Sequence, residues 1–194
     1  MYDRDIRVQL ERSLLKSYRS DRHTRVVEEF DVHRQARIDV AVINGELVGF
    51  EIKSPHDTLK RLESQGRLYA GVFDRLTLVV SDHLFRQALD TLPEFWGIVV
   101  VSGDGHIVLE NFRRPTANDC VRAESLVKLL WREEALTALD HLGAAVGVRG
   151  KARKHVWERL ADSVSLAELK QIVRETLRAR KDWRAGESSS RCDD

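Results

Sequence analysis

Residues 37–54 have the sequence RIDVAVINGELVGFEIKS, in which two runs rich in Val, Ile and Phe flank Asn44-Gly45. An Asn-Gly pair between two such runs is a strong short-range signal for a β-hairpin. We therefore predict strands over residues 37–43 and 46–53. This hairpin decides the fold, because the elements on either side of it must pack against its strands.

Three charged residues, Asp39, Glu51 and Lys53, interrupt the apolar strands of the hairpin. Side chains alternate across a strand, so Glu51 and Lys53 share one face. An ideal two-residue loop turns Asp39 away from Glu51. A three-residue loop with Gly45 in the left-handed conformation instead makes Asp39 a diagonal neighbour of Glu51, roughly 7–8 Å away. A shared site requires this second register or an equivalent bulge.

The composition is that of a folded domain, with 194 residues, 42% hydrophobic and 32% charged content, and a formal net charge of +1. Cys120 and Cys192 are far apart, which excludes a disulfide framework and a four-cysteine metal site. The apolar runs are far shorter than a membrane span. We therefore expect a protein of the reducing cytoplasm without a membrane partner.

The elements around the hairpin are predicted to alternate between helices and strands. Ser54-Pro55-His56-Asp57 is typical of a helix start, and the helix after it carries Gln65 and Tyr69 four residues apart. The next strand is a continuous β-branched run, as in buried parallel strands. The predicted ranges are helix 4–18, strand 24–30, the hairpin, helix 57–73, strand 75–80, helix 83–92, and strands 96–101 and 106–110.

The C-terminal part is predicted to be entirely helical and basic. Residues 113–118 have no periodicity, and helices are expected over 119–141, 150–161 and 166–181. Between residues 149 and 184, eleven Lys or Arg stand against five Asp or Glu, a plausible footprint for a polyanion. We therefore predict a core domain over residues 1–116, a basic helical extension over 117–184 and a disordered tail over 185–194.

The order helix, three strands, helix, strand, with Asp39 in the second strand and Glu51-x-Lys53 in the third, resembles the PD-(D/E)xK nuclease superfamily. Gln65-x-x-x-Tyr69 is similar to the Q-x-x-x-Y motif of its branch of RecB-type and lambda-exonuclease-like enzymes. The chain also resembles short, largely uncharacterised bacterial and mobile-element proteins with this motif order. Ile38 stands where the superfamily has its namesake Pro. The resemblance implies an α/β fold with a restriction-endonuclease-like αβββαβ core and a mixed central sheet flanked by helices.

The resemblance also implies an activity, that of a metal-dependent nuclease that hydrolyses phosphodiester bonds, with DNA as the expected partner and Mg²⁺ or Mn²⁺ as the cofactor. Asp39, Glu51 and the backbone carbonyl of Ile52 would hold the metal, and Lys53 would act on the attacking water. Mg²⁺ prefers such hard oxygen ligands. The remaining candidates are Gln65 and Tyr69, which would line the site, and the possible further ligands Glu11, Glu28 and Glu29.

Simpler interpretations of the same residues remain open. Glu-x-Lys alone is weak evidence, because Glu168-Leu169-Lys170 repeats the tripeptide inside a predicted helix. The three charged strand residues could form a solvated sheet face with surface ion pairs, and Tyr69 could be a core residue. The alternative function is a catalytically inactive nuclease fold that serves as a nucleic-acid or protein docking module. The sequence leaves the choice between DNA and RNA, the mode of cleavage and the oligomeric state undetermined.

Overall fold

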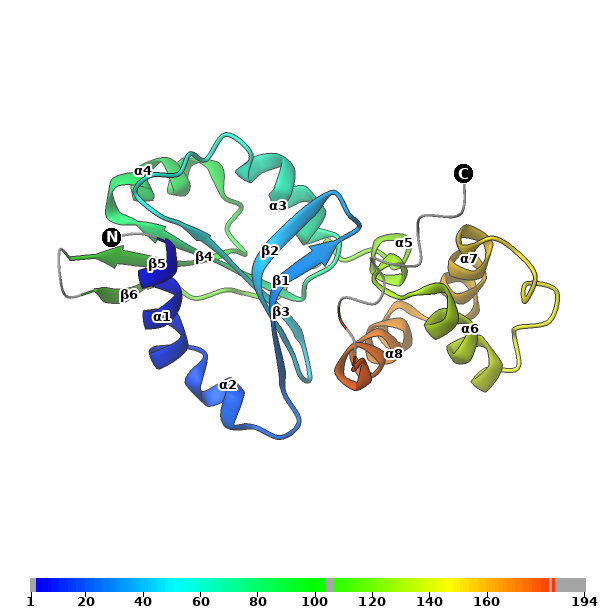
Figure 1. Cartoon of the computed structure of the whole chain (residues 1–194). Coiled ribbons are helices and arrows are strands. Elements are labelled where there is room, and N and C mark those ends of the chain that lie inside the picture. Colours follow the sequence, from blue (N-terminus) through cyan, green and yellow to red (C-terminus); the bar gives the residue numbers. More distant parts are fainter. Residues whose placement is uncertain (1–2, 104–106, 182, 184–194) are drawn as a thin grey trace. The chain divides into compact units, whose positions relative to one another are not determined.

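The protein divides into two compact units between Val121 and Arg122, slightly after the boundary predicted at residue 116. The computed structural model describes residues 3–103, 107–181 and 183. We call the part before this division unit 1 and the part after it unit 2; both are drawn in Figure 1. The predicted disordered tail, residues 185–194, lies outside the described residues.

Unit 1 is built on one mixed sheet of six strands, which lie in the order of the sequence. The pairs β1–β2, β2–β3 and β5–β6 are antiparallel, whereas β3–β4 and β4–β5 are parallel. The predicted α/β class with a mixed sheet is therefore confirmed. The strands are β1 (Arg25–Val32), β2 (Ala36–Ile43), β3 (Leu47–Lys53), β4 (Arg75–Ser81), β5 (Gly97–Ser102) and β6 (Val108–Arg113).

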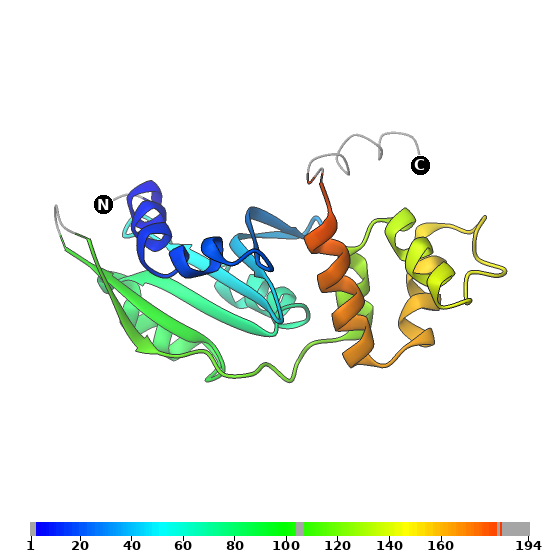
Figure 2. The same cartoon turned by 90° about the horizontal axis from the view of Figure 1, so that it is seen from below.

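Helices cover both faces of this sheet (Figures 1 and 2). On one face, α1 (Asp3–Ser13) buries Ile6 and Leu10 in an apolar cluster with side chains of β2 to β5. On the other face lie α3 (Leu62–Ala70) and α4 (Asp82–Thr91). The Phe73 ring, just after α3, packs edge-on against both Tyr69 and Phe30 of β1. The central strands β3 and β4 are therefore buried on both sides, as their apolar sequences require.

Two helix predictions for unit 1 are wrong in detail. The predicted helix 4–18 is interrupted, because the chain turns after α1 to bury Leu15 and resumes as α2 (Lys16–Ser20). The predicted helix 57–73 begins only at Leu62. Ser54 does not cap it: its amide and hydroxyl both donate to Asp57 Oδ2, at 2.7 and 2.6 Å. The side-chain turn at Ser54–Asp57 therefore ends β3 instead of starting the helix.

The hairpin has a register that the sequence analysis did not include. Ile43 pairs with Leu47, so three residues form the loop, as in the second prediction, but they are Asn44, Gly45 and Glu46. The Asn44 amide donates to the Glu46 carbonyl at 3.0 Å, and the Glu46 amide donates to Asn44 Oδ1 at 2.9 Å. Gly45 does not have a positive φ, contrary to our expectation. The two hydrogen bonds of Asn44 close this three-residue loop. Ile43 therefore pairs one residue later than in the ideal two-residue loop.

Unit 2 is helical, as predicted, but the expected helix 119–141 is broken. The chain leaves helical geometry at Leu130 and Trp131. Trp131 then packs its ring against the Arg180 guanidinium at 4.2 Å, which explains why the helix stops there. The predicted capping box of Ser165 and Glu168 is confirmed. The elements are α5 (Ala123–Leu126), the 3₁₀ helix η1 (Val127–Leu129), α6 (Arg132–His141), α7 (Arg153–Ser163) and α8 (Leu166–Ala179).

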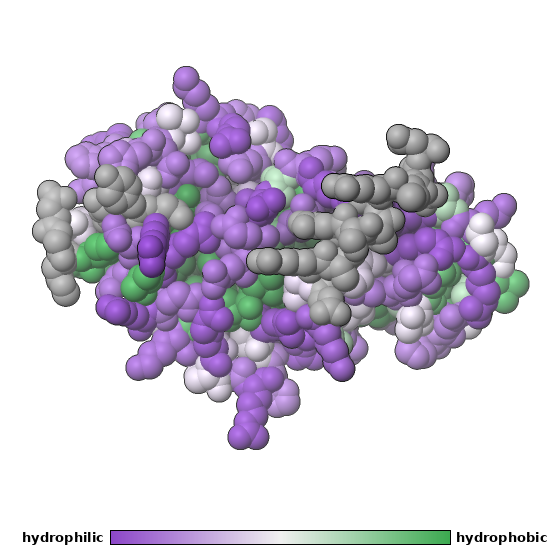
Figure 3. Space-filling model, viewed as in Figure 1, coloured by the Kyte–Doolittle hydropathy of each residue, from purple (hydrophilic) through white to green (hydrophobic). Residues whose placement is uncertain are grey.

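The surface of both units is mainly hydrophilic on the face drawn in Figure 3, with small separate hydrophobic areas. The most exposed large apolar side chain of the described residues is Val146, in the connection between α6 and α7. No helix in the described residues combines the length and apolar character that crossing a membrane requires.

Candidate active site

The side chains of β2 stop alternating regularly at Asp39. Val40 belongs to the apolar cluster under α1. Ile38, two residues earlier, lies on the opposite face: its Cδ1 atom is 2.5 Å from where a Cβ of Gly49 would stand, close to Phe73. Residues two apart in a regular strand share a face. The strand is therefore irregular at Asp39.

The neighbouring strand β1 is irregular at the same level. Glu29 lies in β1 at the level of Asp39 and has a φ of 51°. Strand pairing continues in the same register on both sides of Glu29 but leaves out this residue. A non-glycine residue at positive φ inside a strand is uncommon, and such strain is concentrated at functional sites. The irregular point of β1 therefore lies directly beside Asp39, whereas the three-residue hairpin loop is what places Asp39 opposite Glu51.

Asp39 lies at the end of the β2–β3 ladder, next to Val40, which forms the last pair with Phe50. Its Oδ2 atom accepts a hydrogen bond from the Ile52 backbone amide at 2.6 Å. Its Oδ1 atom accepts from the Arg7 guanidinium, which also lies 3.4 Å from the Asp39 carbonyl oxygen. The same Arg7 nitrogen lies 2.7 Å from Glu29 Oε1. Asp39 is thus held between the backbone of β3 and a cation from α1.

Glu51 continues the hairpin register opposite Asp39 and is 2% exposed. The Lys53 ammonium lies 2.6 Å from Glu51 Oε1. The other oxygen, Oε2, is buried without a hydrogen-bond partner in the described part of the chain. Burial, followed by the charge of Asp39, raises the pKa of Glu51 to about 7 against the opposing effects of Lys53 and Tyr69. The two carboxylates are therefore close enough to repel when both are ionised.

Gln65 and Tyr69 of α3 lie beside these carboxylates. The fully buried Tyr69 donates its hydroxyl to the Arg37 carbonyl oxygen at 2.8 Å, and Gln65 Nε2 lies 3.5 Å from the same hydroxyl. Burial, followed by the nearby charge of Glu51, raises the pKa of Tyr69, so its hydroxyl stays neutral. The structure thus brings all five predicted catalytic residues together, and their catalytic role stays a prediction.

The three further acidic candidates have different positions. Arg19 of α2 binds both oxygens of Glu11 at 2.5 and 2.6 Å and also contacts Glu28 at 3.0 Å. Glu11 and Glu28 are therefore held in a surface ion cluster around Arg19. Glu29 shares Arg7 with Asp39, so it alone of the three is connected to the candidate site.

Arg7 is the site residue that the sequence analysis missed. Its sequence position gives only a polar residue on an amphipathic helix, four residues before Glu11. The contact with Asp39 joins residues 32 positions apart. The only sequence signal was its position next to Ile6, because a helix that packs Ile6 on the sheet places the neighbouring residue close to the strands.

The donor set of the site suits a hard divalent cation. Asp39 and Glu51 provide carboxylate oxygens, and the unpartnered buried Oε2 of Glu51 lacks the positive charge or donor that such an atom normally has. Within the described ranges, no group of three or more His, Cys, Asp or Glu side chains is placed to hold a metal. A metal here would therefore rely on two carboxylates, backbone oxygen and water, which is a combination that Mg²⁺ accepts.

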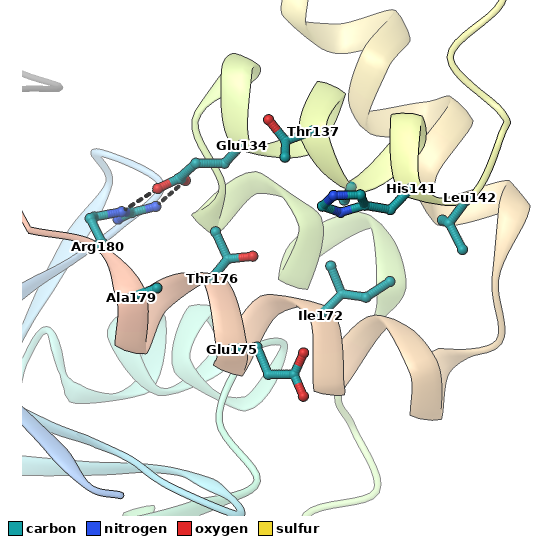
Figure 4. Close-up of a pocket in the computed structure, with 10 residues that line it drawn as sticks. Glu134, Thr137, His141, Leu142, Ile172, Glu175, Thr176, Ala179 and Arg180 are labelled. Atoms are coloured by element: carbon teal, nitrogen blue, oxygen red, sulfur yellow. Dashed lines mark hydrogen bonds and ion pairs between the residues drawn. The ribbon is translucent and has the colours of Figure 1, made fainter. Parts of the chain in front are cut away.

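Unit 2 contains a groove of ≈ 580 Å³ between α6 and α8 (Figure 4). Ile172, Thr176 and Ala179 line it from α8, and His141 and Leu142 line it from α6 and its end. The Glu134–Arg180 ion pair lies at one end. The groove has a mixed lining of apolar, hydroxyl and charged side chains.

Three basic residues recur at helical spacing on α8 and do not line this groove: Lys170, Arg174 and Arg178. Each directly follows one of the buried residues Leu169, Val173 and Leu177. Lys181 lies beyond the helix end at Ala179. The helix α8 therefore presents a basic, a buried and a groove-lining face.

Comparison with known proteins identifies related sequences. The family model described as bacteriophage P4 protein cII matches residues 2–187. Protein cII of Enterobacteria phage P4 is 26% identical over 146 residues, which cover 74% of this chain and 54% of that protein. The chain thus spans about half the length of this curated relative. A solved structure of a protein of unknown function from Silicibacter pomeroyi matches with a TM-score of 0.41 and 24% identity, covering 74% of this chain and 92% of the other.

Proposed function

The chain belongs to the bacteriophage P4 protein cII family, and we propose that it is a nuclease that hydrolyses phosphodiester bonds in DNA with Mg²⁺ or Mn²⁺. The observation that carries the proposal is the pair of carboxylates, Asp39 and Glu51, beside Lys53 at the point where β2 and β3 stop pairing. Glu51 is buried with one oxygen unpartnered in the described residues. A purely structural carboxylate would be expected to have both oxygens satisfied.

The topology of unit 1 supports a restriction-endonuclease-like core within this proposal. The elements follow the order α1, three antiparallel strands, α3 and a fourth strand parallel to the third, with the short α2 inserted before the first strand. This is the αβββαβ order that the sequence resemblance implied. The carboxylates lie where β2 and β3 stop pairing, so a substrate phosphate could approach them without breaking the sheet.

Each residue of the site has a distinct role in the proposal. Asp39, Glu51 and the Ile52 carbonyl would hold the cation. When bound, such a cation lowers the pKa of a water ligand and offsets negative charge on the phosphate. Lys53 has its ammonium 2.6 Å from Glu51, where it would orient the attacking water and stabilise charge on the phosphate in the transition state. A compact ammonium suits this role better than a guanidinium.

Gln65 and Tyr69 would act as positioning residues for Glu51. The Tyr69 hydroxyl is fixed by the Arg37 carbonyl, 2.8 Å away, so the ring cannot swing out of the site without losing a buried hydrogen bond. Gln65 has a buried Oε1 atom without a hydrogen-bond partner among the described residues. This amide oxygen would accept from a metal-bound water or a substrate hydroxyl.

Unit 2 would supply the contacts that hold the DNA backbone. The basic face of α8 and the start of α7 offer candidate phosphate contacts at Lys151, Arg153, Lys170 and Arg174. All four have positively charged ends suited to phosphate. Arg153 also stacks on Trp157, with its guanidinium carbon 4.6 Å from the ring centre. The stacked guanidinium is pre-ordered and can still bind a phosphate through its edge.

The deciding experiment is cleavage of linear and circular DNA with Mg²⁺, with Mn²⁺ and with a chelator. Asp39→Asn and Glu51→Gln should reduce cleavage to background, because they keep the side-chain shape but remove the charge that holds the metal. Lys53→Ala should reduce the rate by about 10²–10³-fold, as for the loss of a single transition-state donor. Ca²⁺ should support binding but little cleavage, because it is less strict in geometry than Mg²⁺.

Matched controls are available in the same unit. Asp90→Asn, Glu63→Gln and Lys60→Ala change exposed residues of the same chemical types and should leave cleavage unchanged. DNA affinity should persist in the site variants, because phosphate contacts elsewhere supply most of it. Wild-type protein that binds DNA but never cleaves DNA or RNA would favour the docking module. Cleavage that survives Asp39→Asn would show that the site is misplaced.

A further inference from the structure

Arg7 projects from a helix that cannot easily move. Its neighbour Ile6 and the residue one turn later, Leu10, are both 0% exposed in the apolar cluster on the sheet. The Arg7 side chain is 23% exposed and reaches from this fixed helix to Glu29 of β1 and Asp39 of β2. Any change in its contacts must therefore come from side-chain rotation.

The guanidinium and a divalent cation would compete for the same oxygen. Arg7 occupies Asp39 Oδ1, while the Ile52 amide occupies Oδ2. Two positive groups at one carboxylate oxygen repel strongly in a partly buried site. Glu51 presents no such conflict, because Lys53 binds only its Oε1 and leaves Oε2 open. A cation must therefore displace Arg7 to bind Asp39 Oδ1.

Glu29 offers the displaced guanidinium a second carboxylate. Its Oε1 atom already lies 2.7 Å from Arg7, and its side chain is 50% exposed. A φ of 51°, as at Glu29, is an energetically costly conformation for a non-glycine residue. A conformation of this cost persists only where the surroundings enforce it, and here it belongs to the residue that shares Arg7 with Asp39.

We propose that Arg7 is an exchangeable counterion of Asp39, which neutralises the metal-free site and moves to Glu29 when a divalent cation binds. The inference rests on the proposed function, because it concerns the same carboxylates. Arg7 then sets the metal affinity of the site. Without metal, the charge of Arg7 reduces the repulsion between Asp39 and Glu51. When a metal binds, the contact between Arg7 and Asp39 must break, which lowers the metal affinity.

Calorimetric titration of the protein with Mn²⁺, without DNA, tests the inference. Arg7→Met keeps much of the aliphatic packing but removes the charge, so Mn²⁺ should bind about tenfold tighter than to wild type. Arg12→Met removes the same charge from an exposed position of the same helix and should leave the Kd close to that of wild type. Unchanged or weaker Mn²⁺ binding by Arg7→Met would overturn the inference and assign Arg7 to positioning Asp39.

A double-mutant cycle with Glu29→Gln tests the second carboxylate. Glu29→Gln should weaken Mn²⁺ binding in the wild type, because it removes the carboxylate charge that receives the displaced Arg7, and should have little effect beside Arg7→Met. Equal weakening in both backgrounds would remove Glu29 from the exchange. If Arg7→Met does not fold, Arg7→Lys replaces it: one shorter donor should give a smaller gain in affinity, and no gain would refute the exchange.

Asp39→Asn separates failure of this inference from failure of the proposed function. Mn²⁺ binding that is absent from wild type and every variant would remove the metal site and with it the nuclease. Binding to wild type that is lost in Asp39→Asn, but is no tighter in Arg7→Met, would leave the metal site in place and reject the counterion alone.

Discussion

Replacing Glu51 with Gln should make unit 1 more stable at neutral pH and less sensitive to pH. Glu51 is buried, and its pKa rises from 4.5 to about 7 on folding. Between these values the folded protein keeps a proton that the unfolded chain has lost, so the free energy of unfolding falls as the pH rises through this window. The pKa difference corresponds to a loss of about 3 kcal/mol at pH 8 relative to pH 4. Glu51→Gln removes the titrating group and therefore this loss.

The measurement is urea unfolding of wild type and Glu51→Gln from pH 4 to pH 8, with a chelator present. Trp96 is buried in unit 1, whereas the other tryptophans belong to unit 2. Its fluorine NMR signal in fluorotryptophan-labelled protein therefore follows unit 1 alone. The variant's free energy of unfolding minus that of wild type should grow by about 3 kcal/mol across the range.

The decisive quantity is how the difference in free energy of unfolding changes with pH. Its absolute value also contains a constant contribution, because Glu51→Gln leaves Lys53 without its ion-pair partner. A difference that stays flat between pH 4.5 and pH 8 would show that Glu51 ionises as in water, and would refute the buried-carboxylate reasoning. Glu63→Gln, which removes an exposed carboxylate of α3, is the matched control.

Three further predictions follow from packing and charge. Gly49→Ala should destabilise unit 1 by about 1–3 kcal/mol in urea unfolding, because its Cβ would lie 2.5 Å from Ile38 Cδ1 and 2.9 Å from Leu76 Cδ2; Gly45→Ala, with nothing within 4 Å, is the control. Arg180→Met should destabilise unit 2 by about 3–5 kcal/mol, measured by the same method, because Glu134 would lose its buried partner; the exposed Arg159→Met should have little effect. Changing Lys151, Arg153, Lys170 and Arg174 to Glu should weaken DNA binding and reduce its salt dependence by about one unit of slope per lost contact; an unchanged slope would return these helices to a packing role.

The sequence predicted the strands of unit 1 well, because their apolar runs are long and bounded by clear turn signals. Asn44-Gly45 indicated the hairpin, and the β-branched run at residues 76–80 indicated a buried parallel strand, β4. The register was wrong, because the Asn44 side chain closes a loop that extends to Glu46. A side-chain hydrogen bond within a loop leaves no mark on hydrophobic periodicity.

The candidate site was predictable only where its residues lie close in sequence. Glu51 and Lys53 share a strand, and Gln65 and Tyr69 share a helix, so spacing alone places each pair. Arg7 reaches Asp39 across three elements, and the irregular backbone at Glu29 depends on tertiary contacts. Long-range charge pairing and backbone irregularity are not encoded in local patterns, and both therefore required the structure.

The sequential order of the six strands has a consequence for folding during synthesis. Each strand of unit 1 after β1 pairs with the strand made immediately before it, so that partner has already left the ribosome when the later strand emerges. Such short-range pairing lowers contact order and favours rapid folding. Asp39 and Glu51 can thus be brought together once the first three strands have emerged, and the nascent chain acquires two repelling carboxylates before α3 covers them. Arg7, synthesised earlier still, is available to neutralise one of them from the outset.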